Sequence, residues 1–168
     1  MLYISPSRVA RYFFHNCERH LYYHGTPKDE RSAKKIPQRP YEHSPVTKAI
    51  LDGGYDWEEK VVKEKINGKI HMTKKKGVLR DNVFDEGNTV KILKKMSEGE
   101  YLYQGCLSAP GSFYEEHNLD PSTVNFTNCF PDLLTVEDGR FRVIDVKASE
   151  EMKISHKVQA DVFNRLLL

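Results

Sequence analysis

The sequence has few cysteines and no long apolar run. Cys17, Cys106 and Cys129 are its three cysteines among 168 residues, and none of them forms a CxxC pair. An odd and widely spaced set argues against a disulfide framework and against a self-contained zinc site. No apolar stretch approaches the roughly 18 residues that a membrane-spanning helix needs, and the N-terminus lacks the basic-then-apolar order of a secretion signal. We therefore expect a soluble, cytoplasmic protein with reduced thiols.

Acidic residues are nearly absent from one segment and basic residues from another, although the formal net charge is only +2. Residues 60–80 contain eight lysines and arginines and one acid, and residues 98–145 contain nine acids and two arginines. The basic segment, with Lys74, Lys75 and Lys76, is suited to a phosphate backbone, whereas the acidic segment would repel one unless cations intervened. A solvated lysine-rich face explains the basic segment equally well.

Periodicity predicts one amphipathic helix near the N-terminus. Ser5-Pro6 is a helix-start signal, and apolar residues recur every four positions from there to Gly25: Val9, Phe13, Cys17 and Leu21. Residues 26–44 contain three prolines and no periodicity, so they are predicted to form a loop or lid.

A second helix-start signal, Ser44-Pro45, predicts a helix towards Ile66. We expect this helix to bend at its two adjacent glycines and to bury Trp57 and Val61. A third helix is predicted from a cap at Asn88 or Thr89 up to Gly99.

Beyond Gly99 the pattern becomes extended. Aromatic and branched residues separated by turn formers predict strands over 101–109, 123–130, 133–137 and 140–147, with a further short strand within 68–76. A last helix is predicted from about Ile154 to the apolar C-terminus, which lacks a capping residue and is expected either to continue in a longer protein or to be covered by a partner. This order predicts an α/β or α+β sheet with helices packed on it, in a single domain over 1–168.

The hairpin at 131–147 carries the most chemical information. Asp138-Gly139 between two apolar strands is the preferred two-residue type I′ turn, and it predicts that Glu137 faces Arg140. Counting outward, Asp132 lies opposite Asp145 at the end of two central strands, and Lys147 shares their face. Like charges in opposed positions repel, so two aspartates there need a reason.

A hard divalent cation is one such reason. Mg²⁺ or Mn²⁺ stabilises clustered carboxylates and takes phosphate oxygens as further ligands. Lys147 would then stabilise negative charge that develops on an attacking water or on the phosphate. A surface hairpin with solvated acids is the alternative.

Several motifs together resemble one family. Pro131-Asp132 followed by Asp145-Val146-Lys147 looks like the core of the PD-(D/E)XK nuclease superfamily. Gln159 to Phe163 resembles the Q-x-x-x-Y motif of its RecB-like branch, and Ser5 to Arg8 and Cys17 to Tyr23 resemble the opening helix of RecB-like nucleases and CRISPR-associated adaptation exonucleases. The resemblance implies a restriction-endonuclease-like core, with a central mixed sheet of about four to five strands flanked by helices.

The resemblance also implies roles for single residues. Glu58 is the expected third acid of the metal site, with Glu59 as the runner-up, and the carbonyl of Val146 is an additional candidate ligand. Gln159 would hydrogen-bond the lysine or the DNA. A solvent-facing pair of glutamates is the alternative for Glu58 and Glu59.

Some relatives bind an iron–sulfur cluster through four cysteines. Cys17 occupies the first of those positions, but the chain ends before the other three would appear. We expect no cluster in this chain, and a buried small apolar residue is the simpler account of Cys17.

The resulting hypothesis is a Mg²⁺- or Mn²⁺-dependent deoxyribonuclease. Family analogy favours an exonuclease on single-stranded DNA in repair, recombination or defence, with a helicase or another repair or defence protein as partner. Arg8, Arg11 and the three consecutive lysines are candidates for guiding the backbone, with ordinary surface charge as their alternative. A non-catalytic nucleic-acid-binding module and a metal-binding structural domain are competing hypotheses.

Overall fold

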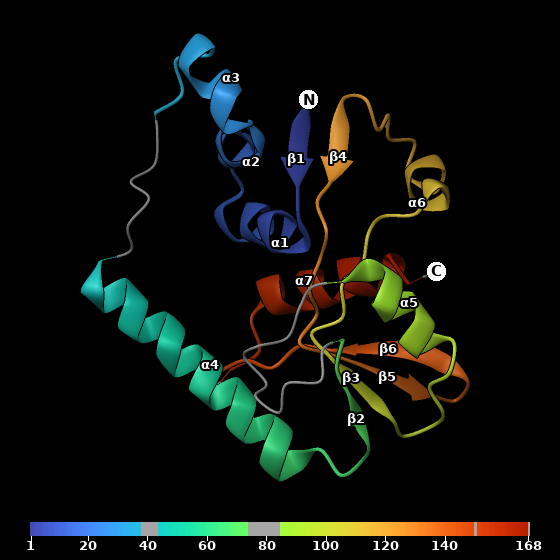
Figure 1. Ribbon diagram of the computed structural model, residues 1–168. Coiled ribbons are helices and arrows are strands. Elements are labelled where there is room, and N and C mark those ends of the chain that lie inside the picture. Colours follow the sequence, from blue (N-terminus) through green and yellow to red (C-terminus); the bar gives the residue numbers. More distant parts are fainter. Residues whose placement is uncertain (38–43, 74–84, 150, 168) are drawn as a thin grey trace. The chain divides into compact units, whose positions relative to one another are not determined.

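The computed structural model describes residues 1–37, 44–73, 85–149 and 151–167, which form two compact units (Figure 1). The first unit comprises Met1–Tyr41, Ser108–Cys129 and Met152–Leu168, and the second comprises Glu42–Leu107 and Phe130–Glu151. The described residues contain a four-stranded mixed sheet, a two-stranded sheet and seven helices. The predicted α/β class is therefore confirmed.

The first unit combines a small parallel sheet with five helices among its described residues. α1 packs against α7, and β1 pairs with β4 so that Leu2 lies beside Val124. Its elements are β1 (Leu2–Ile4), α1 (Pro6–His15), α2 (Glu18–Gly25), α3 (Lys28–Ala33), α6 (Gly111–Glu116), β4 (Val124–Phe126) and α7 (Ile154–Arg165).

The N-terminal helix is interrupted, so the prediction of one continuous helix was wrong. Ser5 caps α1 as predicted, but Asn16 has a φ of +47° and ends the helix before α2 begins. Asparagine enters the left-handed region more readily than most residues, and this local turn overrides the four-residue apolar repeat. Phe13, which belongs to that repeat, is 56% exposed.

A helix also occupies part of the predicted loop at 26–44. α3 carries Asp29 and Glu30 in its first turn, where negative charge favours a helix N-terminus. The buried guanidinium of Arg31 donates hydrogen bonds to the carbonyl groups of Thr26 and Tyr23. These contacts offset the proline-rich composition, and residues 38–43 lie outside the described part. The sequence pattern missed α6 and β1 as well.

The second unit is built on the four-stranded sheet, in the order β2-β3-β5-β6. β2 runs parallel to β3, and the other neighbours are antiparallel. Its elements are α4 (Pro45–Lys65), β2 (Ile70–His71), α5 (Glu86–Leu93), β3 (Tyr101–Tyr103), β5 (Leu133–Glu137) and β6 (Arg140–Ile144).

The β5–β6 hairpin has the predicted register. Glu137 pairs with Arg140, and the pairing continues to Leu133 and Ile144. Asp138 and Gly139 have φ values of +52° and +69°, as a type I′ turn requires at both central positions. Only β5 is interior, however: β6 is the last strand of the described sheet, so the expectation of two central strands was half wrong.

α4 is a single helix of 21 residues, and it shows no clear bend at the two glycines where one was expected (Figure 1). Its buried residues are Glu58 and Val62, whereas Trp57 is 43% exposed, so the predicted buried face was wrong by one residue. Val62 packs against Tyr103 and Leu133 of the sheet. Because residues four apart share a helix face, this packing turns Glu58 inwards as well.

α5 covers other side chains of the same sheet. Asp85, rather than Asn88 or Thr89, caps this helix, and the helix ends at Leu93, before Gly99. Thr89 is fully buried and lies close to Leu102 and Leu134 around Gly105. Neither α5 nor any other helix in the described part of the chain combines the length and apolarity needed to cross a membrane.

Candidate active site

Two aspartates flank the paired ends of β5 and β6. Asp132 directly precedes Leu133, Asp145 directly follows Ile144, and these two strand residues are register partners. The N–H group of Val146 donates a hydrogen bond of 2.7 Å to Asp132 Oδ2. The hairpin therefore brings together the two segments that the sequence predicted to meet.

Glu58 reaches the same place from α4. Glu58 is 8% exposed and lies one helical turn before Val62, which packs against Tyr103 and Leu133. A buried carboxylate at this position is close to the start of β5 because Leu133 belongs to the same hydrophobic cluster as Val62. The helix and the hairpin thus supply three carboxyl groups to one region.

Electrostatics shows that these groups act on one another. Burial and the nearby charges of Glu58 and Asp145 together raise the pKa of Asp132 to about 8, and burial is the largest cause. The positive charge of Lys147 and the hydrogen bond from Val146 act in the opposite direction. The uncharged form of Asp132 is therefore favoured, because burial and the neighbouring carboxyl groups disfavour its negative charge.

Lys147 forms an ion pair with Asp145. Its Nζ donates to Asp145 Oδ1 at 2.7 Å, and the side chains are 32% and 7% exposed, respectively. The other oxygen, Asp145 Oδ2, is buried and has no hydrogen-bond partner among the described residues. A buried carboxylate oxygen without a partner is costly, and it marks a position suited to a cation or an ordered water.

The sequence analysis missed Gln104 and Tyr103. Gln104 Nε2 donates a hydrogen bond of 3.1 Å to Glu58 Oε1, and its backbone N–H donates to the Asp132 carbonyl at 2.9 Å. Burial and a hydrogen bond to Glu58 raise the pKa of Tyr103. In the sequence, the one signal for this position is the Gln104-Gly105 pair directly after an aromatic strand. The contact between Gln104 and Glu58 forms only in the folded chain.

The carboxylates fit a hard divalent cation with water and phosphate as its remaining ligands. In the described segments, no three histidine, cysteine, aspartate or glutamate side chains are grouped closely enough to enclose a metal ion. Mg²⁺ needs less than that, since it retains several waters and binds through one or two carboxylates and substrate phosphates. Asp145 Oδ2 and the Asp132 carboxyl group are oxygen donors of this kind.

Glu59 is oriented differently from Glu58. It forms an ion pair with Lys63, one turn further along α4. This pairing and the contacts of Glu58 with Gln104 distinguish the two adjacent glutamates, and they favour Glu58 as the third acid.

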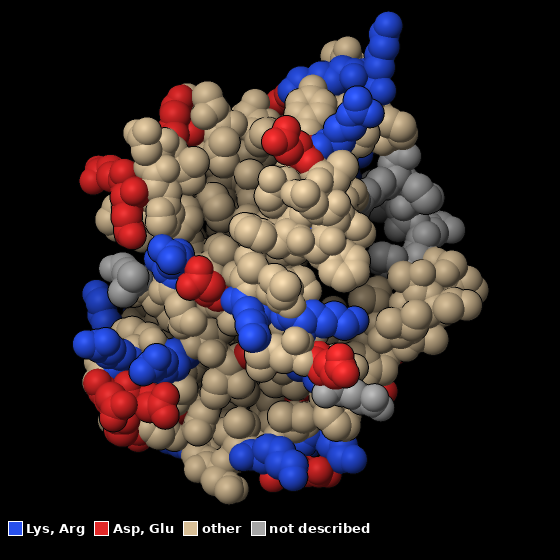
Figure 2. All heavy atoms as spheres, turned by 180° about the vertical axis from the view of Figure 1, so that it is seen from behind, with Lys and Arg blue, Asp and Glu red and all other residues tan. Residues whose placement is uncertain are grey.

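The other predicted site residues lie elsewhere in the chain. Gln159 belongs to α7, and Arg8 and Arg11 belong to α1, all in the first unit, so their approach to the carboxylates stays a prediction. Lys74, Lys75 and Lys76 lie outside the described residues. On the face seen in Figure 2, basic and acidic side chains are interspersed, and the described residues form no continuous basic surface in this view.

None of the three cysteines forms a disulfide. Cys106 and Cys129 are buried, and Cys17 is half-buried at the start of α2. Cys106 belongs to the second unit and the other two belong to the first.

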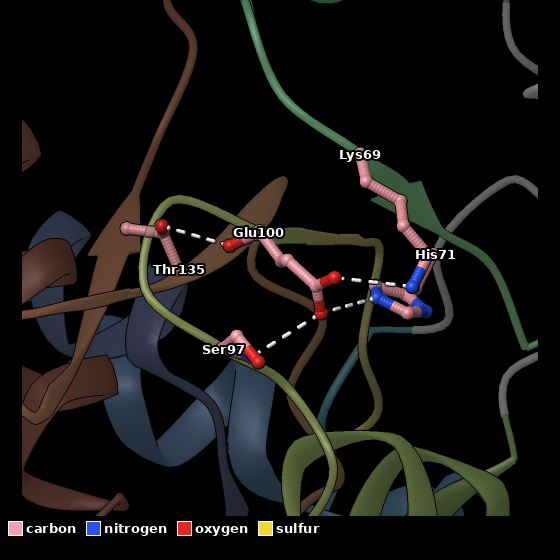
Figure 3. A network of polar contacts seen from close by, with 5 residues as sticks. All are labelled: Lys69, His71, Ser97, Glu100 and Thr135. Atoms are coloured by element: carbon pink, nitrogen blue, oxygen red, sulfur yellow. Dashed lines mark hydrogen bonds and ion pairs between the residues drawn. The ribbon is translucent and has the colours of Figure 1, made fainter.

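A second polar network lies at the opposite end of β3 (Figure 3). Glu100 accepts hydrogen bonds from His71, Lys69 and the N–H group of Ser97, which lower its pKa to about 2. Its carbonyl accepts a hydrogen bond from Thr135. These contacts tie β2 to β3 and β5. Both carboxylate oxygens of Glu100 have hydrogen-bond donors, so this network lacks the uncompensated carboxyl groups found around Asp132.

A cavity of about 490 Å³ lies within the first unit. Phe13, Phe113 and Phe126 contribute to its largely apolar wall, and the Asp161–Arg165 ion pair also lines it. None of the three carboxyl groups around Asp132 lines this cavity.

The comparisons with known proteins supply no family assignment. No protein-family model matches the chain, and searches of curated proteins and of solved structures found no significant match.

Proposed function

We propose that the protein is a Mg²⁺- or Mn²⁺-dependent deoxyribonuclease. The observation that carries the proposal is the buried group of Glu58, Asp132 and Asp145 beside Lys147, in which burial and neighbouring negative charge raise the pKa of Asp132 to about 8. Strongly perturbed carboxyls with specific charge partners are concentrated at functional sites. The order of the motifs, which resembles RecB-like nucleases, supports a phosphodiester as the substrate.

Each residue has a distinct role in this proposal. Asp132 and Asp145 would hold the cation, with Glu58 and the Val146 carbonyl as additional candidate ligands. The bound ion supplies positive charge that lowers the pKa of a coordinated water and stabilises negative charge on the phosphate. Lys147 would leave its ion pair with Asp145 to stabilise the attacking water and the transition-state charge.

The substrate preference is proposed from the resemblance. Single-stranded DNA degraded from an end is the expected substrate, in repair, recombination or defence, together with a helicase or another repair or defence protein. Arg8, Arg11 and Gln159 are the proposed contacts to the strand.

Cleavage assays with isosteric variants test the proposal. Labelled single-stranded and double-stranded DNA, linear and circular, is incubated with Mn²⁺ or with EDTA. We expect Mn²⁺-dependent cleavage of linear single strands, and a loss of about 100-fold or more in kcat/KM for Asp132→Asn and Lys147→Met. The proposal fails if the wild-type protein cleaves no DNA with Mn²⁺ or Mg²⁺, or if both variants retain full activity.

Glu58→Gln and Glu59→Gln form a matched pair for the third acid. The substitutions are identical and adjacent, but only Glu58 is buried against Gln104, whereas Glu59 pairs with Lys63. We expect Glu58→Gln to lower kcat/KM strongly and Glu59→Gln to change it less than twofold. Equal losses would contradict the assignment.

A non-catalytic nucleic-acid-binding module is the second candidate. Two observations favour it: Lys147 occupies one oxygen of Asp145, and no three-ligand metal group occurs in the described ranges. This candidate predicts DNA binding that is unchanged by EDTA and by Asp132→Asn, without cleavage.

A further inference from the structure

We infer that Gln104 is a positioning residue, which holds the Glu58 carboxylate in place against the backbone of Asp132. The inference rests on the proposed function, because it concerns the orientation of a candidate ligand in that site. Gln104 belongs to none of the motifs that the resemblance supplies.

Gln104 joins two elements that are far apart in the sequence. Its side-chain amide donates to Glu58 Oε1 of α4 at 3.1 Å, and its backbone N–H donates to the Asp132 carbonyl at the start of β5 at 2.9 Å. Gln104 therefore links Glu58 directly to the backbone of Asp132, in addition to the hydrogen bond between Tyr103 and Glu58.

The backbone at this position is unusual. Gln104 has a φ of +46°, which is costly for a residue with a long side chain, and it directly follows the last residue of β3. Gly105 comes next, and a Cβ atom there would lie 3.0 Å from Leu134 Cδ1. Such a conformation persists where the surrounding structure determines it, and here the hydrogen bonds of Gln104 and the close packing of Gly105 do so.

The contact has a consequence for ligand geometry. Glu58 has a flexible side chain, and without a donor on Oε1 several rotamers become available to it. Loss of a residue that orients a metal ligand typically lowers metal affinity by about 10–100-fold. Gln104 thus restricts the rotamers of Glu58 by holding Oε1 at hydrogen-bond distance from its amide.

Mn²⁺ binding tests this role in the full chain. Gln104→Asn keeps a side chain that tolerates positive φ but is one methylene too short, and Gln104→Gly removes the side chain while it relieves the backbone cost. Asn118→Gly is the matched control, because Asn118 also has a positive φ, +51°, and belongs to the first unit. Affinity is measured by titration calorimetry, and thermal unfolding is recorded for every variant.

We expect both Gln104 variants to weaken Mn²⁺ binding by about tenfold or more, and Asn118→Gly to leave it unchanged. In a Glu58→Ala background, Gln104→Gly should cause no additional loss, because its effect passes through Glu58. Unchanged affinity in folded Gln104 variants, or an equal loss in the Glu58→Ala background, would overturn the inference while the proposed nuclease stands. If the wild-type protein binds Mn²⁺ but cleaves no DNA, the nuclease proposal fails, and the Gln104 variants alone decide the positioning role. A wild-type protein that binds no Mn²⁺ refutes both.

Discussion

At the scale of single residues, the burial of neighbouring carboxyl groups in the candidate site carries an electrostatic cost. Burial and the charges of Glu58 and Asp145 raise the pKa of Asp132 to about 8, well above its unfolded value of about 4. The native state therefore binds more protons than the unfolded state between these two pH values. Stability from this group is greatest below about pH 4 and falls as the pH rises through 8.

Asp132→Asn should remove that part of the pH dependence. The amide is nearly isosteric, and its oxygen still accepts the hydrogen bond from Val146, while the negative charge is gone. At pH 8 to 9 in EDTA, we expect the variant to be more stable than the wild type by about 1–3 kcal/mol, with little difference near pH 4. Urea unfolding across this pH range measures the difference.

Addition of Mg²⁺ at pH 8 provides the control for this stability change. The ion should stabilise the wild type and not the variant, because it neutralises the same carboxyl group. A variant that is less stable than the wild type at every pH would show that the Asp132 charge is already compensated within the chain.

At the scale of elements, a hairpin turn and a helix face decide where the carboxyl groups lie. The type I′ turn sets the register of β5 and β6, and the helical face shared by Glu58 and Val62 directs α4 onto the sheet. Glu98 reinforces the hairpin turn, since its carboxylate accepts hydrogen bonds from the N–H groups of Asp138 and Gly139.

The same substitution should have opposite effects in these two elements. Gly139→Ala places a Cβ on a residue with a φ of +69° and should destabilise the protein by about 1–2 kcal/mol, although nothing lies within 4 Å of that Cβ. Gly54→Ala, inside α4 and equally unobstructed, should stabilise it by about 0.5–1 kcal/mol. Urea unfolding of both variants checks the signs, and a stabilising Gly139→Ala would contradict the type I′ turn.

At the scale of the whole molecule, the candidate acids and the predicted DNA-binding arginines belong to different compact units. The carboxyl groups of Glu58, Asp132 and Asp145 belong to the second unit, and Arg8 and Arg11 belong to the first. With a formal net charge of only +2, the proposed binding to DNA would depend on local cations rather than on the total charge.

Arg11→Ala should therefore weaken single-stranded DNA binding and reduce its salt dependence. The slope of log K against log salt concentration should fall by about 0.7, the value for one phosphate contact on a single strand. Fluorescence anisotropy at several salt concentrations measures it. Arg140→Ala is the charge-matched control at the exposed hairpin of the second unit, and an equal change in both variants would mean that total charge alone is responsible.

The hairpin and several helix ends could be predicted from local sequence. Asp138-Gly139 determines a tight turn, and once that turn is set the pairing of Glu137 with Arg140 and of Leu133 with Ile144 follows by counting. Ser5-Pro6 and Ser44-Pro45 likewise mark true helix starts. These features depend on neighbouring residues, so the information is present in a short stretch of chain.

The tertiary structure decided the rest of the site. Which face of α4 is buried, and hence that Glu58 rather than Trp57 turns inwards, depends on the packing of Val62 against β3 and β5. The contact between Gln104 and Glu58 likewise depends on side chains that meet only in the folded chain. The sequence alone determined that two aspartates lie at the paired ends of one hairpin, because strand register is a local property. Only the fold decided which further groups surround them, because burial and charge coupling arise between segments that are distant along the chain.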